Sequence, residues 1–190
     1  MKKLTLTVVA LLMLVTTCRV QAQDDAMMKA WQAYMTPGDV HKMMAKDNGQ
    51  WDAEVTMWMV PGAPPEKSKG SSENSMIMGG RYQQCLFKGT MMGMPFEGMS
   101  IMGYDNSKKA FVSSWIDNMG TGIMHMDGTW DDATKSINFK GTCVDPMTGK
   151  DTNIRQVMKF VDDDNQILEM YCNMDGKEVK NMEIKYSRKK

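Results

Sequence analysis

From residue 49 onward, hydrophobic and polar residues alternate along the chain with a period of two. In "WDAEVTMWM", the apolar Trp51, Val55 and Met57 fall on one face, and the acidic Asp52 and Glu54 fall on the other. Later segments of about 8 to 12 residues, rich in Val, Ile, Phe, Tyr and Thr, are separated by turn sequences such as "DNSKK", "DDATK" and "DPMTGK". The pattern predicts about ten short strands, each pairing with the next through a hairpin.

No helical pattern interrupts this run of strands, so the segment 49–190 is expected to form one meandering antiparallel sheet. A sheet of this many strands avoids exposed edges by closing on itself. We therefore predict an all-β fold, a single antiparallel meander barrel of about ten strands that occupies one domain.

Helical patterns occur before the strands, in residues 23–48. Acidic residues open "DDAMMKAWQAYM", whose apolar residues then fall at helical spacing. A second short helix is predicted with Thr36 as its cap and Pro37 at its first position, and Gly49 can end it. His41 lies in this second helix, where we expect a packing or capping role. One or two short N-terminal helices should thus precede the barrel.

The first 22 residues have the pattern of a secretory signal peptide. Lys2 and Lys3 precede an apolar run that is too short for a membrane helix, and "VQA" then provides small residues for cleavage after Ala22. We expect export to the periplasm or beyond the cell. A lipid anchor at Cys18 is the less favoured alternative, because Thr17 stands where Gly, Ala or Ser is usual.

Removal of this segment leaves 20 basic against 23 acidic residues, a net charge of about −3. The chain has no long basic patch, so nucleic-acid binding is not expected. Three cysteines remain, Cys85, Cys143 and Cys172, and no C-x-x-C spacing occurs. An odd number in an oxidising compartment leaves open one disulfide with a free thiol, or three thiols.

Methionine is unusually common: 22 of the 24 methionines follow the predicted cleavage site, whereas Leu86 and Leu168 are the only leucines there. Because methionine is apolar and flexible, we expect it to replace leucine as buried core filler. Copper(I) bound by thioethers and imidazole, as in Met124-His125-Met126, and haem ligated by His125 are alternatives that we do not favour. No cofactor and no metal are predicted.

Two positions at the ends of the predicted barrel resemble a known superfamily. Gly49-Gln50-Trp51 opens the first strand, and Arg188 lies in the last, "MEIKYSRKK". The pair is similar to that of the calycin superfamily (lipocalins and fatty-acid-binding proteins), where a G-x-W tryptophan packs beneath an arginine from the end of the barrel. The resemblance implies that Gly49, Trp51 and Arg188 close one end.

A wider set of motifs spans nearly the whole chain after the signal peptide. "GQW", "PGAPP", "GGRY", "GYDN", "WIDNMGT" and the closing "YSRKK" occur in one order. Together they resemble the exported bacterial family known as domain of unknown function 1579. That resemblance implies a fold and a compartment, and it carries no activity.

The segment "KAFVSSWIDN" provides the candidate site. Its period of two places Phe111, Trp115 and Asp117 on one face, a mixture of apolar and polar groups that suits the interior of a ligand-binding barrel. Alternatively, Asp117 accepts hydrogen bonds from the following "NMGTG" turn. With side chains expected from neighbouring strands and one charge partner, the candidate pocket residues are Glu97, Tyr104, Phe111, Trp115, Asp117 and Arg155.

The leading functional prediction is an exported barrel that binds a small, largely apolar molecule in its interior. One alternative is an enzyme that uses a buried carboxylate of the same cavity, with Glu97, Asp117 or Glu169 as acid or base. No serine or cysteine nucleophile has a recognisable histidine partner. The other alternative is a protein-interaction module whose barrel is filled by its own side chains.

Overall fold

The computed structural model describes residues 23–190 with gaps at 60–61 and 175. The predicted signal peptide and Cys18 lie outside the described residues. Residues 23–35 form a helix, in which the rings of Trp31 and Tyr34 are in contact with centroids 6.0 Å apart. The remaining structure, Pro37–Lys190, is a separate compact unit. Within the described ranges, no helix is long and apolar enough to cross a membrane.

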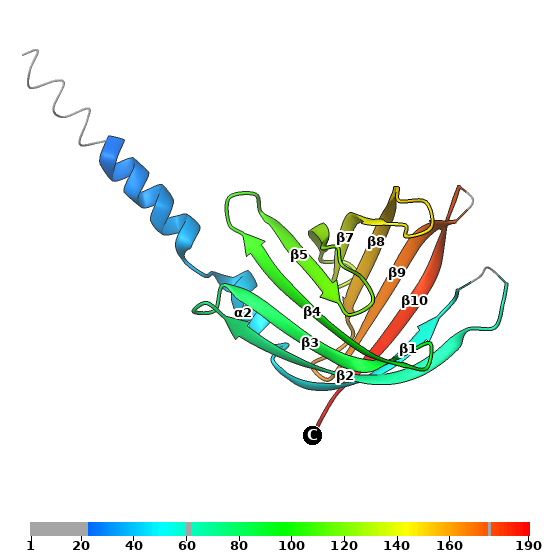
Figure 1. Cartoon of the computed structure of the whole chain (residues 1–190). Helices are drawn as coiled ribbons and strands as arrows, with labels where there is room; N and C mark the ends of the chain where they lie inside the picture. The colour runs from blue at the N-terminus through cyan, green and yellow to red at the C-terminus, as the bar shows by residue number, and fades with distance from the viewer. Residues whose placement is uncertain (1–22, 60–61, 175) are drawn as a thin grey trace, which may run out of the picture. The chain divides into compact units, whose positions relative to one another are not determined.

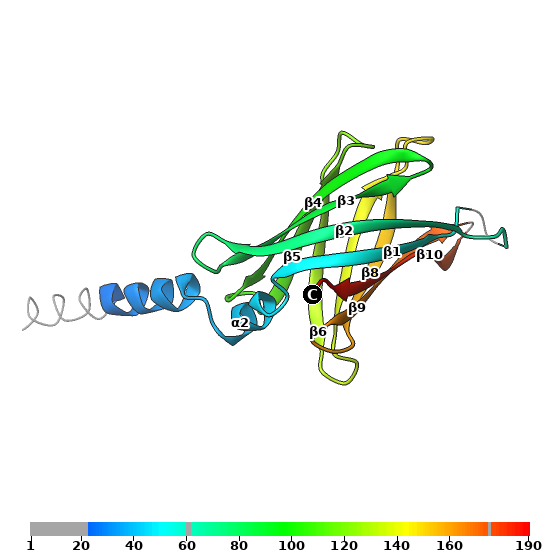
Figure 2. The same ribbon diagram turned by 90° about the horizontal axis from the view of Figure 1, so that it is seen from below.

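The second unit is a closed barrel of ten antiparallel strands (Figures 1 and 2). Each strand pairs with its neighbours in sequence, and β1 pairs with β10 to close the sheet. This confirms the predicted meander barrel. The strands are β1 (Gly49–Met57), β2 (Glu66–Ile77), β3 (Tyr82–Met91), β4 (Met94–Asp105), β5 (Ala110–Asp117), β6 (Met124–Asp131), β7 (Ser136–Val144), β8 (Asp151–Phe160), β9 (Asn165–Met174) and β10 (Lys177–Arg188).

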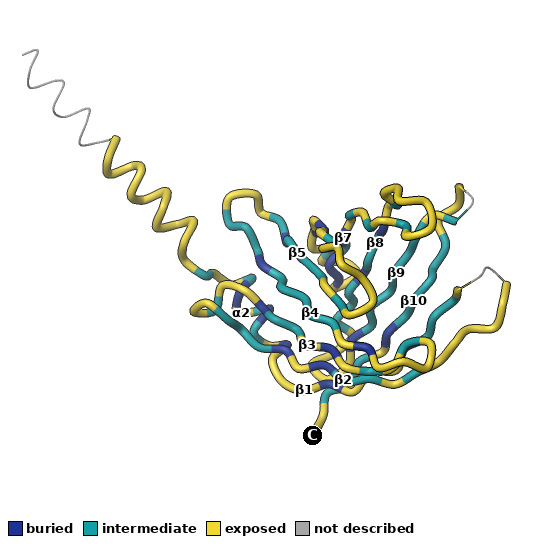
Figure 3. The backbone as a smooth tube through the Cα atoms, in the orientation of Figure 1, coloured by how far each residue is buried: buried dark blue, intermediate teal, exposed yellow. Residues whose placement is uncertain are grey.

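Alternating burial along β1 shows why this sequence forms a barrel wall. Trp51, Ala53 and Val55 are buried, whereas Asp52 and Glu54 between them are exposed. Successive side chains of a strand point to opposite faces, so each strand of this type presents an apolar face to the interior and a polar face to water. Within the barrel, the longest runs of exposed residues lie in the turns between strands (Figure 3).

The short helix α2 (Asp39–Ala45) leads into β1 and begins later than predicted. Its N-cap is Gly38, whose N–H donates to Nδ1 of His41 at 3.0 Å. The hydroxyl of Thr36 instead donates to the carbonyl of Gln32 at 2.6 Å, at the end of the preceding helix, so Thr36 does not cap α2. The expected capping and packing role of His41 is confirmed, since this side chain is buried as well.

One end of the barrel is plugged by apolar side chains. Helix α2 lies against β2, β3 and β4. Its Met44 packs into a buried cluster with residues of β5, β6 and β7, namely Phe111, Met126, Ile137 and Phe139. We call this end, where α2 joins β1, the closed end. A second cluster lies along the wall and includes Val55, Phe87, Phe96 and Ile184.

The residues predicted to close the barrel do so. Trp51 is fully buried, and the guanidinium carbon of Arg188 lies 4.2 Å from its ring centroid. Arg188 also donates hydrogen bonds to the carbonyl oxygens of Lys46, Asn48 and Asp163. These bonds connect the end of β10 to the α2–β1 loop and to the β8–β9 turn. Gly49 has a φ of +124°, and a Cβ there would lie 3.2 Å from Nη1 of Arg188. Glycine is therefore favoured at this position.

Candidate ligand-binding site

The interior of the barrel contains a cavity of about 350 Å³, and residues from all ten strands line it. This volume lies within the range of small-molecule pockets. The interaction-module alternative requires a barrel that is filled by its own side chains. This barrel is not filled.

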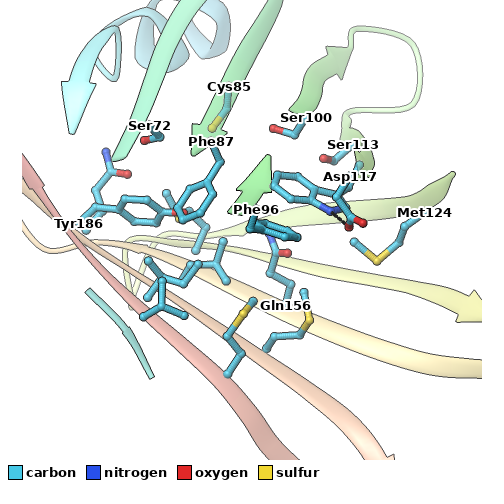
Figure 4. A pocket seen from close by; sticks show the side chains of 18 of the residues that line it. Ser72, Cys85, Phe87, Phe96, Ser100, Ser113, Asp117, Met124, Gln156 and Tyr186 are labelled. Atoms are coloured by element: carbon cyan, nitrogen blue, oxygen red, sulfur yellow. Dashed lines mark hydrogen bonds between the residues drawn. The ribbon is translucent and has the colours of Figure 1, made fainter. Parts of the chain in front are cut away.

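Aromatic rings form one part of the cavity wall (Figure 4). The rings of Phe87 and Phe96 meet edge to face at 5.9 Å, and Phe96 stacks on Trp115 at 6.3 Å. Together the three rings give a continuous apolar surface on β3, β4 and β5. Such surfaces provide much of the favourable free energy when apolar ligands are buried.

Many methionines also line the cavity, which corrects the expectation that they are buried core filler. Among the described residues, Met44 and Met126 are the fully buried methionines. The others on the inner face stay partly accessible because they border an empty space, and a flexible thioether adapts well to varied ligands. The methionines that line the cavity are Met57, Met91, Met92, Met102, Met124, Met126, Met158, Met170 and Met182.

Trp115 points into the cavity, as its strand parity predicts. Its indole ring lies over Gly98, which pairs with Asp117 on the neighbouring strand, and a Cβ at Gly98 would overlap the ring. Its Nε1 donates to Oδ2 of Asp117 at 2.7 Å. The glycine and the carboxylate therefore hold the indole in one orientation.

The carboxylate of Asp117 is satisfied by groups of its own hairpin. Besides the Trp115 indole, it accepts hydrogen bonds from the backbone N–H groups of Met119 at 2.9 Å and Gly120 at 3.1 Å. This matches the alternative in which the turn after β5 supplies the donors. Asp117 lines the cavity, yet its role there is to position Trp115 and the turn.

Tyr104 and Phe111 belong to the closed end of the barrel. Phe111 is 1% exposed within the plug, and the Tyr104 ring packs against it with centroids 5.1 Å apart. In the β4–β5 register Tyr104 faces Phe111, whereas Trp115 faces Ser100. The prediction that Tyr104 approaches Trp115 is therefore wrong.

Glu97 and Arg155 lie on the outer face of the barrel, which corrects their expected position beside Trp115. Glu97 is exposed and forms an ion pair with Lys88 at 3.4 Å. Arg155 forms two hydrogen bonds with Glu178, at 2.9 and 2.7 Å, and its guanidinium stacks on Tyr171. Neither residue contributes to the cavity wall.

Glu169, the third carboxylate considered for catalysis, also has structural partners. It forms ion pairs with Lys159 at 2.7 Å and Lys180 at 3.2 Å, and it accepts a hydrogen bond from Tyr171. Burial raises the pKa of Glu169, but the hydrogen bonds from the two lysines, the charge of Lys159 and the hydrogen bond from Tyr171 together outweigh this, so the pKa is lowered. Glu97, Asp117 and Glu169 therefore do not converge on one site.

A polar group that the sequence did not reveal lies at the closed end of the cavity. Its four buried members are Asp47, Asn74, Gln83 and Gln166, which we call the floor cluster. Oδ2 of Asp47 accepts a hydrogen bond from Nδ2 of Asn74 at 2.9 Å, and Oδ1 accepts one from Nε2 of Gln166. Gln83 donates to the carbonyl of Met44 at 2.8 Å. The cavity thus has a mainly apolar surface and a cluster of buried polar groups at its closed end.

The pKa of Asp47 is raised from 3.8 to about 6. Burial is the main cause, because it disfavours the charged form. Hydrogen bonds from Gln166, Asn74 and Gln83 and the charge of Arg188 oppose the shift without cancelling it. Two other neighbours of Asp47 titrate higher, since burial raises the pKa of Cys85 to about 11 and raises that of Tyr186 further.

Asp47→Asn is expected to remove a pH dependence of stability between about pH 4 and pH 6. In this window the unfolded chain loses the Asp47 proton before the folded chain does, so wild-type stability falls as pH rises. Across this window, the free energy of unfolding of the wild type should fall by about 2–3 kcal/mol relative to that of the variant, as the size of the Asp47 pKa shift implies. Cys85 stays neutral throughout this window.

Urea unfolding of both proteins at several pH values measures this difference. Asp52→Asn, which removes an exposed carboxylate from the outer face of β1, is the matched control. Parallel stability curves for the wild type and Asp47→Asn would contradict the prediction.

The remaining chemically active side chains do not form a reactive centre. The raised pKa of Cys85 leaves its thiol protonated at neutral pH, and Cys85, Cys143 and Cys172 are all free in the described part of the chain. His125 is exposed on the outer face of β6, whereas its neighbours Met124 and Met126 line the cavity. The strand therefore separates the imidazole from the two thioethers.

The fold and the site define a class: a closed ten-stranded antiparallel barrel with an apolar cavity and a polar floor. The chain belongs to the family described as protein of unknown function (DUF1579), whose model matches residues 36–188. No curated protein matches the chain. Among solved structures, it is similar to the crystal structure of Rv2717c from M. tuberculosis, with 11% identity and a TM-score of 0.61. The match covers 82% of this chain and 100% of that chain, and it shows a shared fold.

Proposed function

We propose that this protein is an exported barrel that binds a small, largely apolar molecule in its interior. The observation that carries the proposal is the cavity of about 350 Å³, whose surface is mainly apolar, with aromatic rings and thioethers in its wall and a buried polar cluster at its closed end. Cavities of this size with a few placed polar groups are typical of ligand-binding barrels. Export rests on the pattern of residues 1–22 alone.

The enzyme alternative has less support from the site. A buried carboxylate without structural partners would favour it, because such a group is free to exchange a proton with a substrate. Asp47 is the most deeply buried carboxylate of the cavity, but both of its oxygens accept hydrogen bonds from side-chain amides. Binding without chemistry is therefore the proposal, and it involves no haem or copper.

Native mass spectrometry of the protein purified from its own host tests the proposal. We expect a population heavier than the polypeptide by one small molecule, and this mass should disappear in denaturing solvent. The stripped protein should then bind the neutral apolar dye N-phenylnaphthylamine at a single site, with increased dye fluorescence. A protein that retains nothing and does not bind the dye would contradict the proposal.

A further inference from the structure

The floor cluster contains a buried oxygen atom that has no hydrogen-bond partner. Oδ1 of Asn74 is fully shielded, and the residue is 8% exposed. Nδ2 of the same amide donates to Oδ2 of Asp47. Turning the amide over would place Oδ1 against that carboxylate oxygen, so its orientation is fixed. A buried acceptor without a donor is costly, which makes this atom an exception that requires an explanation.

The nearest donors of the closed end are directed at other acceptors. Nε2 of Gln166 donates to Asp47, and Nε2 of Gln83 donates to the carbonyl of Met44. The indole N–H of Trp51 donates to the carbonyl of Asp47 at 3.1 Å. None of the donors among the described residues makes a hydrogen bond to Oδ1 of Asn74, and Asn74 lines the cavity, so a bound molecule is the natural source of the donor.

One other buried oxygen without a partner lies among the described residues, Oδ1 of Asn181. It also lines the cavity, but it belongs to the other end of the barrel, where its carbonyl accepts a hydrogen bond from the N–H of Trp58 beyond the end of β1. Asn74 by contrast pairs with Gly49 at the start of β1. Asn181 is only partly buried, whereas Asn74 is buried and belongs to the floor cluster, so Asn74 is the stronger candidate.

We propose that the ligand is an apolar alcohol whose hydroxyl group donates a hydrogen bond to Oδ1 of Asn74 at the floor of the cavity. This inference rests on the proposed function and names its ligand class. The hydrocarbon part then lies along the wall of Phe87, Phe96 and Trp115. A fatty acid is a poorer fit, because its carboxylate brings a second negative charge beside Asp47 and has no proton to donate.

Three probes of matched length test the headgroup: decanol, its isomer nonyl methyl ether, and decanoate. The ether keeps an acceptor oxygen but has no donor. Each probe competes with N-phenylnaphthylamine for the wild-type protein at about pH 8, where Asp47 is ionised. We expect decanol to bind about tenfold more tightly than the ether, since only decanol satisfies the buried acceptor. Decanoate should bind less tightly than either.

Two variants locate the hydrogen bond. Asn74→Leu should reduce the preference for decanol over the ether to near one. Asn181→Leu removes the other unpartnered oxygen by the same substitution and should leave the preference unchanged. Circular dichroism checks that each variant is folded. If Asn74→Leu does not fold, the ratio of the two wild-type affinities still decides whether a donor is recognised.

The outcomes separate this inference from the function on which it rests. Equal binding of decanol and the ether would overturn the alcohol assignment while leaving the apolar binding site in place. Loss of the preference in Asn181→Leu rather than Asn74→Leu would overturn the placement at the floor. A wild-type protein that binds neither the dye nor any probe would overturn both proposals.

Discussion

Trp51→Ala is expected to lower the free energy of unfolding by about 3–5 kcal/mol, the usual range for truncating a buried large aromatic. Trp51 is fully buried at the closed end of the barrel. The substitution leaves a cavity there, removes the stacking of Arg188, and frees the carbonyl of Asp47 from its indole donor. These losses fall where β1 and β10 close the sheet, so they act on the whole barrel.

Chemical denaturation followed by circular dichroism measures this effect. Trp130→Ala is the matched control, since Trp130 is 36% exposed and its indole hydrogen bond to Asp132 is long, at 3.4 Å. Trp130→Ala should lower the free energy of unfolding by clearly less than Trp51→Ala does. Equal losses in the two variants would show that Trp51 has no special role in closing the barrel.

The architecture could be predicted from the sequence because its signals are local. Apolar residues alternate within each strand, and turn residues such as Asp105, whose carboxylate accepts hydrogen bonds from the N–H groups of Ser107 and Lys108, mark the hairpins. In a meander each strand pairs with the next, so local signals determine the whole topology. The contact of Trp51 with Arg188 joins the first and the last strand, and it was predicted from the resemblance to calycins.

The wall of the site was predicted in part. Trp115 and Asp117 follow from strand parity, whereas Glu97 was expected from its place on the neighbouring strand and Arg155 as a charge partner. Residues that face the cavity on β4, such as Phe96 and Ser100, are out of phase with Glu97. The same parity argument that placed Trp115 inside would have placed Glu97 outside.

The floor cluster could not be assembled from sequence because its members are distant in the chain. Asp47 and Asn74 are 27 residues apart, and Asp47 and Gln166 are 119 apart. A local signal did exist, since Gln166 shares its face with the apolar Leu168 and Met170. Polar residues in phase with an apolar face indicate a buried polar group, but only barrel closure shows that they meet.

The role of the methionines was misjudged for a different reason. A buried core and the wall of an apolar cavity require the same kind of side chain, so composition does not distinguish a filled barrel from a hollow one. The volume that remains depends on how ten strands close, and on side chains such as Phe96 and Trp115 that stack along the wall instead of meeting across the interior.

Trp115→Ala is expected to abolish ligand retention and to leave the fold intact. Trp115 is only partly buried, and it extends the aromatic wall into the cavity. The loss of such a ring from a binding site typically costs about 2–4 kcal/mol of binding free energy. Its removal also leaves Asp117 without the indole donor, although the backbone N–H groups of Met119 and Gly120 still hold that carboxylate.

Native mass spectrometry and dye titration measure retention and affinity, and circular dichroism measures the fold. Ile116→Ala is the matched control, because Ile116 is the adjacent residue on β5 and is 40% exposed on the outer face. It should retain the ligand as the wild type does. Trp115→Phe keeps an aromatic ring at this position and should bind with intermediate affinity. If Trp115→Ala retains the ligand as well as Ile116→Ala does, the molecule does not lie against this wall.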